Sequence, residues 1–120
     1  RDPESCLVGS EMCIRDRVMS ERITAEDFRR ADGVGDWVVV GEEARAVFRT
    51  GSFSAGVALV DSIGVLADAA NHHPDVDLRY PAVTVTLTTH DAGGLTELDV
   101  RLAREISRAA GDLGVSAARD

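Results

Sequence analysis

Two long stretches of the chain repeat their apolar residues at the three-to-four spacing of a helix. In 52–71, the stripe expected to face the core comprises Phe53, Val57, Val60, Ile63, Ala67 and Ala70. After Thr96, a second stripe comprises Leu102, Ile106, Ala109 and Leu113. Each stripe spans several helical turns, so we expect two helices that pack against one core.

Two short motifs predict where helices begin. Thr24 is followed three residues later by Asp27, and Thr96 is followed in the same way by Asp99. This spacing resembles a capping box, in which a hydroxyl and a carboxylate bind the free amides of the first helical turn. The first motif predicts a short helix that reaches about Ala31, and the second predicts the start of the last helix.

Four segments have the composition or alternation of strands: 36–40, 44–50, 76–80 and 83–89. Gly41 suits a turn between the first two, which predicts a β-hairpin. Pro81 separates the last two, and the pattern is compatible with either a tight turn or one bent strand. The predicted order is α-β-β-α-β-β-α, which indicates an α+β domain.

Composition limits the size of the fold and its partners. A chain of 120 residues fits one domain with one core. The net charge of −8 disfavours direct binding to nucleic acid, because the acidic surface repels phosphate. No continuous apolar run reaches the roughly 18 residues of a membrane helix, so we expect a soluble, cytoplasmic protein.

All 13 basic residues are arginine, which holds its proton too tightly for acid–base chemistry near neutral pH. The absence of lysine also excludes Schiff-base catalysis and a P-loop. Proton transfer is left to the carboxylates and to His72, His73, His90, Tyr80, Cys6 and Cys13.

The first part of the chain differs from the rest. Residues 1–18 show neither helical nor strand periodicity and precede Met19, so we interpret them as a non-native or disordered segment before a domain at 19–120. A native flexible tail is the alternative. Cys6 and Cys13 lie outside the periodic domain, which gives little support to a disulfide or to a two-thiol metal site.

The three histidines lie at the ends of predicted helices and strands. His72 and His73 come at the end of the long helix, which Pro74 should stop, and Asp68 lies four residues before His72, where it could orient that ring. His90 ends the last strand, just before a glycine-containing loop. Each histidine alone could be an ordinary surface or core residue, but all three lie at element ends.

Metal binding by the histidine pair and ligand stacking on Trp37 are alternative roles for these residues. Neighbouring helical residues point about 100° apart, so His72 and His73 cannot easily bind one metal ion together. Trp37 is expected in the core or at an interface rather than as a ligand platform.

The segment from Asn71 to Ile106 resembles the pterin-4a-carbinolamine dehydratase family. The resemblance rests on His72, His73, Pro74, Tyr80, Thr89, His90, Gly94 and Asp99, and it extends more weakly upstream through Trp37, Phe48 and Phe53. It implies three helices on one face of a four-stranded antiparallel sheet. It also implies a homodimer or homotetramer and no metal or organic cofactor.

The same resemblance implies an activity and a site. The reaction would be loss of water from a 4a-hydroxytetrahydropterin to give a quinonoid dihydropterin, within tetrahydrobiopterin recycling. The catalytic residues would be His72, His73 and His90, with either of the first two as acid and the last as base, or the reverse. The substrate-binding residues would be Asp68, Asn71, Pro74, Thr89, Asp91, Ala92 and Asp99.

Two departures and two alternatives qualify this resemblance. The family commonly has glutamate at Asp68 and an aromatic residue at Val76, which affects the expected substrate preference. One alternative is a non-catalytic module that acts as a transcriptional cofactor or an assembly factor. The other is an enzyme for a different hydroxylated pterin.

Overall fold

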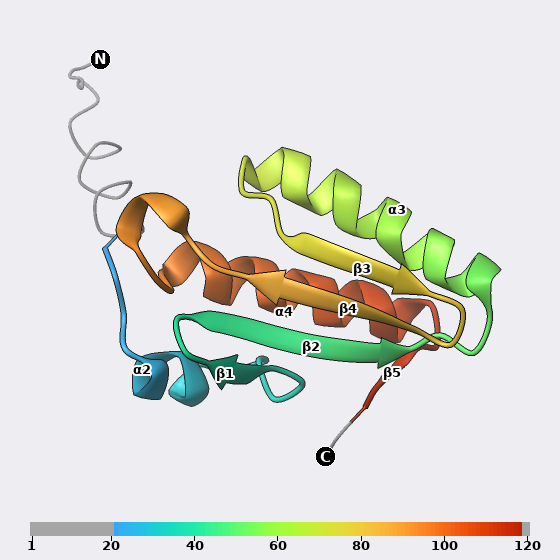
Figure 1. Cartoon of the computed structure of the whole chain (residues 1–120), viewed down its shortest axis with the longest axis horizontal. Helices are drawn as coiled ribbons and strands as arrows, with labels where there is room; N and C mark the ends of the chain where they lie inside the picture. The colour runs from blue at the N-terminus through green and yellow to red at the C-terminus, as the bar shows by residue number, and fades with distance from the viewer. Residues whose placement is uncertain (1–20, 119–120) are drawn as a thin grey trace.

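The computed structural model describes residues 21–118, so the expectation for residues 1–18 falls outside the described part. The helices are α2 (Ala25–Arg30), α3 (Phe53–Ala70), the short 3-10 helix η1 (His90–Ala92) and α4 (Glu97–Asp112). The strands are β1 (Val38–Val40), β2 (Glu43–Arg49), β3 (Asp75–Arg79), β4 (Ala82–Leu87) and β5 (Ser116–Ala117). The predicted α+β class is confirmed (Figure 1).

The strands form one antiparallel sheet in the order β1-β2-β4-β3. β5 is an additional strand, so the expected count of four is wrong for the described residues. It pairs Ala117 with Phe48 and Ser116 with Arg49, near the end of β2. The chain returns there after Gly114, which has the positive φ of 75° that favours glycine. A strand of two residues is too short to show an alternating pattern.

The predicted break at Pro81 is a tight turn. β3 and β4 form a hairpin in which Arg79 pairs with Ala82, leaving Tyr80 and Pro81 as the connection. Tyr80 is largely exposed there. The hairpin positions the histidine pair before β3 and His90 after β4.

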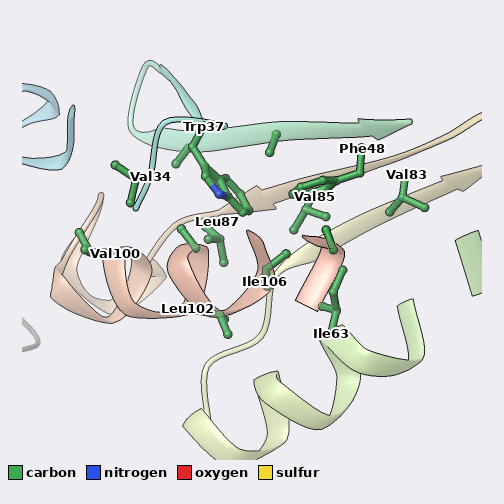
Figure 2. Packing of buried hydrophobic residues seen from close by; sticks show 14 of the residues in the cluster. Val34, Trp37, Phe48, Ile63, Val83, Val85, Leu87, Val100, Leu102 and Ile106 are labelled. Carbon is green, nitrogen blue, oxygen red and sulfur yellow. The ribbon is translucent and has the colours of Figure 1, made fainter. Parts of the chain in front are cut away.

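One face of the sheet is buried in the core (Figure 2). Alternate residues of β2 and β4 point into it: Ala44, Ala46, Phe48, Val83, Val85 and Leu87. Trp37 was expected in the core or at an interface, and it lies in the core: the residue is 6% exposed and its ring packs edge-on against Phe48. Its indole Nε1–H donates to Oγ of Ser107 on α4 over 2.9 Å, which ties the sheet side of the core to that helix.

The apolar stripe predicted for α3 is partly wrong. The helix buries Gly56, Leu59, Ile63 and Ala67, whereas Phe53 and Val57 are about half exposed. By length and composition α3 could cross a membrane, with a mean hydropathy of 1.5, because apolar residues occur on nearly every side. Periodicity alone therefore could not orient it. A Cβ at Gly56 would lie 2.6 Å from Cδ1 of Leu78, so this glycine permits the close approach of α3 to the sheet.

The stripe predicted for α4 also needs one correction. Leu102 and Ile106 are buried as expected, but Leu113 is 46% exposed because it lies just beyond the end of the helix. The buried face also includes Asp99, a charged residue at the start of the helix. A carboxylate in the core requires partners, and these partners define the candidate site.

Candidate active site

The end of α3 directs the histidine pair away from the helix. The helix ends at Ala70, and Asn71 adopts left-handed geometry with φ 52°. The amide of His72 donates back to the Ala67 carbonyl over 3.1 Å, which is the pattern of a Schellman cap. The pair therefore follows the helix instead of continuing its last turn.

This cap changes the carboxylate that each histidine meets. Asp68 was expected to orient His72, but its Oδ1 lies 2.9 Å from Nε2 of His73. The expectation is wrong because the turn at Asn71 breaks the helical spacing of four on which it depended. Both members of this pair are well exposed, at 58% for His73 and 81% for Asp68.

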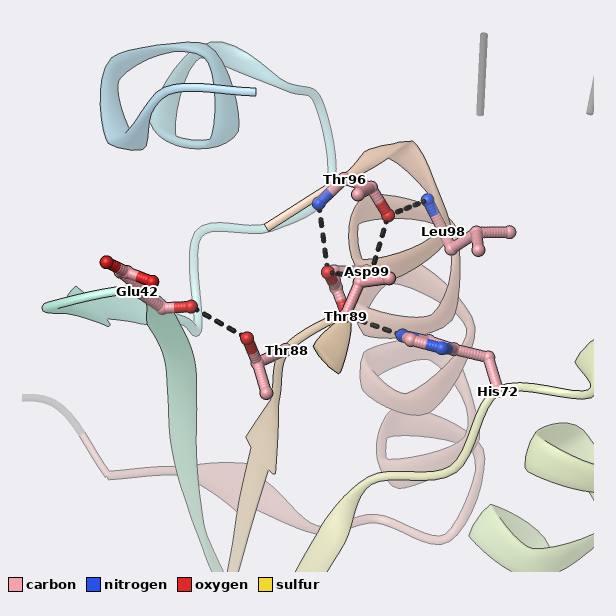
Figure 3. A network of polar contacts seen from close by, with 7 residues as sticks. All are labelled: Glu42, His72, Thr88, Thr89, Thr96, Leu98 and Asp99. Carbon is pink, nitrogen blue, oxygen red and sulfur yellow. Dashed lines mark hydrogen bonds and ion pairs between the residues drawn. The ribbon is translucent and has the colours of Figure 1, made fainter. Parts of the chain in front are cut away.

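His72 instead reaches across to the start of α4. Its Nε2 lies 2.6 Å from Oδ1 of Asp99, which is 27 residues away in the sequence (Figure 3). The His72 side chain is 11% exposed and that of Asp99 is fully buried. A contact this short between an imidazole and a buried carboxylate fixes both the position and the orientation of the ring.

Two threonines hold the other oxygen of Asp99. Oδ2 accepts from the backbone amide of Thr96 over 2.9 Å and from Oγ1 of Thr89 over 2.7 Å. The hydroxyls of Thr89 and Thr96 are themselves 2.9 Å apart, and Thr96 Oγ1 accepts from the Leu98 amide over 3.2 Å. Figure 3 shows that this network joins the end of β4, the start of α4 and the loop after α3. The capping box predicted at Thr96 is thus present, and its carboxylate also holds His72.

His90 is on the loop that starts at Thr89. The amide of Thr89 donates to the Gly94 carbonyl over 2.9 Å, and Gly93 donates back to Thr89 with a left-handed φ of 73°. This tight loop contains η1 and leaves His90 exposed. The chain thus brings His90 next to the residue that holds Asp99, although no hydrogen bond joins its ring to His72 or His73 in the described residues.

The remaining expected substrate-binding residues occupy different environments. Asp91 and Asn71 are exposed, and Pro74 and Ala92 are half-buried. Thr89 and Asp99 are buried and use their polar atoms within the protein.

Sequence reasoning missed the pairing of His72 with Asp99 and the part that Thr96 plays in it. The available signal was the Thr96–Asp99 capping box, which indicated a helix start and gave no indication of a distant histidine.

Two further kinds of site bear on these histidines, a cluster of metal ligands and a cavity, and in residues 21–118 the first is absent. Within residues 21–118, no three His, Cys, Asp or Glu side chains are grouped closely enough to hold a metal ion. An open cavity of about 430 Å³ borders the far end of the His90 loop. Its lining comprises Arg22, Ile23, Thr24, Ala25, Gly41, Glu42, Gly94 and Leu95, so the three histidines lie outside it.

Comparison with known proteins identifies the family. The sequence model described as "Pterin 4 alpha carbinolamine dehydratase" matches residues 17–109, which include all three histidines and Asp99. The chain belongs to the pterin-4a-carbinolamine dehydratase family. The resemblance found in the sequence is thereby confirmed, and the family supports a dehydratase, or lyase, type of activity.

Individual relatives agree with this family. A protein of Roseiflexus sp. is 45% identical over 89 residues, covering 73% of this chain and 96% of the relative. One from Chloroflexus aurantiacus is 49% identical over 76 residues, covering 63% of this chain and 82% of the relative. Both are provisionally named pterin-4-alpha-carbinolamine dehydratases.

A solved structure of the family has the same fold. The crystal structure of a protein from Brucella melitensis, described as a transcriptional coactivator/pterin dehydratase, matches with a TM-score of 0.67 and 33% identity. The match covers 76% of this chain and the whole of the Brucella chain. The description of this one relative thus names both a coactivator and a dehydratase.

Proposed function

We propose that this chain catalyses the dehydration of a 4a-hydroxytetrahydropterin to a quinonoid dihydropterin. The observation that carries the proposal is the 2.6 Å contact between His72 and the fully buried Asp99. Stability alone does not account for a histidine fixed to a buried charge, because apolar residues of similar volume often stabilise a core as well as such a pair or better. In a family of pterin dehydratases, a ring held in this way suits a proton-transfer group.

The reaction requires two proton transfers, and imidazole can perform both. A base removes the proton on N5 of the pterin, and the electron pair of that N–H bond forms the new double bond between N5 and C4a. The C4a–O bond breaks with its electrons on oxygen, and an acid protonates the departing hydroxide to give water. Imidazole titrates near neutral pH, so a histidine can serve either side.

We assign these roles to His72, His73 and His90. His72 or His73 supplies one proton-transfer group and His90 the other, with the direction left open. His73 and His90 are exposed, so a bound pterin can reach them from solvent. Positioned proton transfer of this kind contributes about 100-fold to 10,000-fold in rate.

The substrate contacts are assigned by burial. Exposed Asn71 and Asp91, with half-buried Pro74 and Ala92, are proposed to contact the pterin directly. Asp68 is proposed to act through His73, to which it is hydrogen-bonded. Thr89 and Asp99 are proposed to act through His72, because they are buried behind it.

The setting of the activity is also part of this proposal. We propose a cytoplasmic homodimer or homotetramer that takes part in tetrahydrobiopterin recycling and needs no metal or organic cofactor. Nucleic acid and membrane are not expected to be direct partners, given a net charge of −8 and a long helix that contributes to the core.

A second candidate function is a non-catalytic binding module. The Brucella relative is described as a transcriptional coactivator as well as a dehydratase. On α3, the large side chains of Phe53, Val57 and Val65 are between 46% and 66% exposed, which would suit a protein partner. This candidate does not explain why His72 is fixed to a buried carboxylate.

The test is dehydration of freshly generated 4a-carbinolamine by the purified chain, followed by the absorbance of the quinonoid product. The wild type is expected to exceed the buffer rate, and His72→Ala, His73→Ala and His90→Ala are each expected to be slower. If all four proteins gave the same rate, the enzymatic function would be wrong and the binding module would be favoured.

A further inference from the structure

We propose that Thr96 and Thr89 form a one-way chain of hydrogen-bond donors that ends on Asp99. This chain holds His72 with its proton on Nε2 and leaves Nδ1 as the nitrogen that exchanges protons with the pterin. The inference rests on the proposed function and adds positioning residues and a working atom to it.

The direction of the chain follows from counting protons. The Leu98 amide can only donate, so Thr96 Oγ1 accepts from it. Thr89 Oγ1 uses its single proton to donate to Asp99 Oδ2. In the 2.9 Å contact between the two hydroxyls, Thr96 must therefore be the donor and Thr89 the acceptor. Each hydroxyl then donates once and accepts once, and neither can reverse without losing a bond.

The chain determines which nitrogen of His72 carries a proton. Oδ2 of Asp99 already accepts from the Thr96 amide and from the Thr89 hydroxyl. An aspartate is ordinarily ionised at neutral pH, and an ionised carboxylate has no proton to give to the imidazole. The 2.6 Å contact at Oδ1 therefore requires Nε2 of His72 to be the donor.

The free nitrogen is then Nδ1. In the neutral ring it is bare and accepts a proton when His72 acts as a base. In the imidazolium it carries a proton that it can give to the departing hydroxide. Nε2 keeps its proton in both states because the contact with Asp99 depends on it. With its side chain 11% exposed, His72 has limited access to solvent, so a proton on Nδ1 has few alternatives to the bound pterin.

His73 provides a contrast within the same site. Its carboxylate partner Asp68 is 81% exposed, and the structure gives that pair one hydrogen bond with no threonine behind it. Water can replace Asp68 at little cost, so the tautomer of His73 is not fixed in the same way. The donor chain therefore distinguishes two adjacent histidines that look equivalent in the sequence.

The first part of the test measures tautomers without any substrate. Protein labelled with ¹⁵N-histidine is examined by long-range ¹H–¹⁵N spectroscopy above the titration midpoint of each ring, with His72→Ala identifying the signal. The wild type is expected to show His72 only as the Nε2–H form. A bare Nε2, or rapid mixing of the two tautomers, would overturn the donor chain.

The variant Asp99→Asn makes the sharpest change. The oxygen of the introduced amide remains with the Thr96 amide and the Thr89 hydroxyl, so its NH₂ group faces His72. Nε2 must then accept, which moves the proton of the neutral ring to Nδ1. We expect the His72 spectrum to switch to the Nδ1–H form and kcat to fall by at least about 100-fold, with KM changed only a few-fold. An unchanged tautomer would contradict the inference.

Variants of Thr89 test the hydroxyl chain itself. Thr89→Val removes the donor at nearly constant shape, and we expect kcat to fall roughly tenfold, as for a lost hydrogen bond to a charged group. Thr89→Ser restores the hydroxyl and is expected to recover most of the rate. The matched control is Thr88→Val, whose hydroxyl donates to the Glu42 carbonyl instead, and it should behave as wild type.

The outcomes separate this inference from the proposed function. Equal rates for Thr89→Val and Thr88→Val, with thermal melts showing both folded, would overturn the positioning role of Thr89. A wild type with the Nε2–H tautomer but no dehydration above the buffer rate would overturn the proposed function and the role of Nδ1, while the donor chain would stand.

Discussion

The two capping boxes in residues 21–118 have the same spacing of threonine and aspartate but different surroundings. At the start of α2, the backbone amide of Thr24 donates to Oδ2 of Asp27 over 3.1 Å. The backbone amide of Asp27 donates to Oγ1 of Thr24 over 3.0 Å, and both bonds lie at the surface. At the start of α4, the Thr96 amide donates to Asp99 over 2.9 Å, in the core. The surface box only begins a helix, whereas the buried one also holds His72.

The difference shows how a local motif acquires a function. A capping carboxylate has two oxygens, and the backbone amide needs only one of them. At the surface the second oxygen of Asp27 is available to water. In the core the second oxygen of Asp99 must find a protein donor, and a histidine brought there by another element satisfies it. The cap thus holds the imidazole rigidly without any additional carboxylate.

The largest contrast is expected when each capping carboxylate is removed. Asp99→Ala leaves the Thr96 amide, the Thr89 hydroxyl and His72 without their acceptor in the core. We expect the free energy of unfolding to fall by about 3 kcal/mol in urea denaturation. Asp27→Ala at the surface should cost far less. Similar losses for the two variants would show that burial does not distinguish the boxes.

The histidines should differ in the same sense. His72→Ala leaves the buried charge of Asp99 with fewer partners, and we expect it to lower the free energy of unfolding by about 2 kcal/mol. His73→Ala removes an exposed pair, which is worth less than about 0.5 kcal/mol. Thermal and urea melts of both variants check the order, and a larger loss for His73→Ala would contradict it.

The capping hydroxyls provide a smaller contrast. Thr24→Ala is expected to cost about 1 kcal/mol, as is usual for a surface N-cap. Thr96→Ala also breaks the buried contact with Thr89, so we expect about 1.5 kcal/mol. Chemical denaturation measures both, and equal costs would mean that the hydroxyl chain adds nothing to the stability of the second box.

The smallest effect is a pH dependence at the surface box. The backbone amide of Thr24 and then its hydroxyl lower the pKa of Asp27 below its usual value of 3.8. The stability from ionised Asp27 is therefore complete above that value and is lost as the pH falls through the lowered one. Melts of wild type and Asp27→Asn should differ by a constant amount above about pH 5 and converge in acid. A difference that grew in acid would have the wrong sign.

Local features of the fold were predictable from the sequence. Both capping boxes were correctly identified because the residues that form them are three positions apart. The strands of the two hairpins were also predictable, β1 from its β-branched residues and the other three from alternation, which in β2 and β4 reflects one buried face of the sheet. The short β5 and the buried face of α3 were not predictable, because two residues show no pattern and α3 is apolar nearly all round.

The site was predictable only as a set of residues. Resemblance to the family named the histidines and Asp99, whereas the helical spacing of four residues assigned Asp68 to the wrong histidine. The left-handed turn at Asn71 caused that error, because it separates His72 from the helical face of Asp68. The contact between His72 and Asp99 joins residues 27 apart, and nothing in the local pattern of either residue points to the other.

The most direct test of the account compares the dehydration rates of Asp99→Asn and Asp27→Asn with that of the wild type, under conditions where all three are folded. Each substitution changes one capping carboxylate to an amide, and only one of these carboxylates holds a histidine. We expect Asp27→Asn to match the wild type and Asp99→Asn to lose at least about 100-fold. Equal rates for the two variants would contradict the claim that the buried cap serves catalysis.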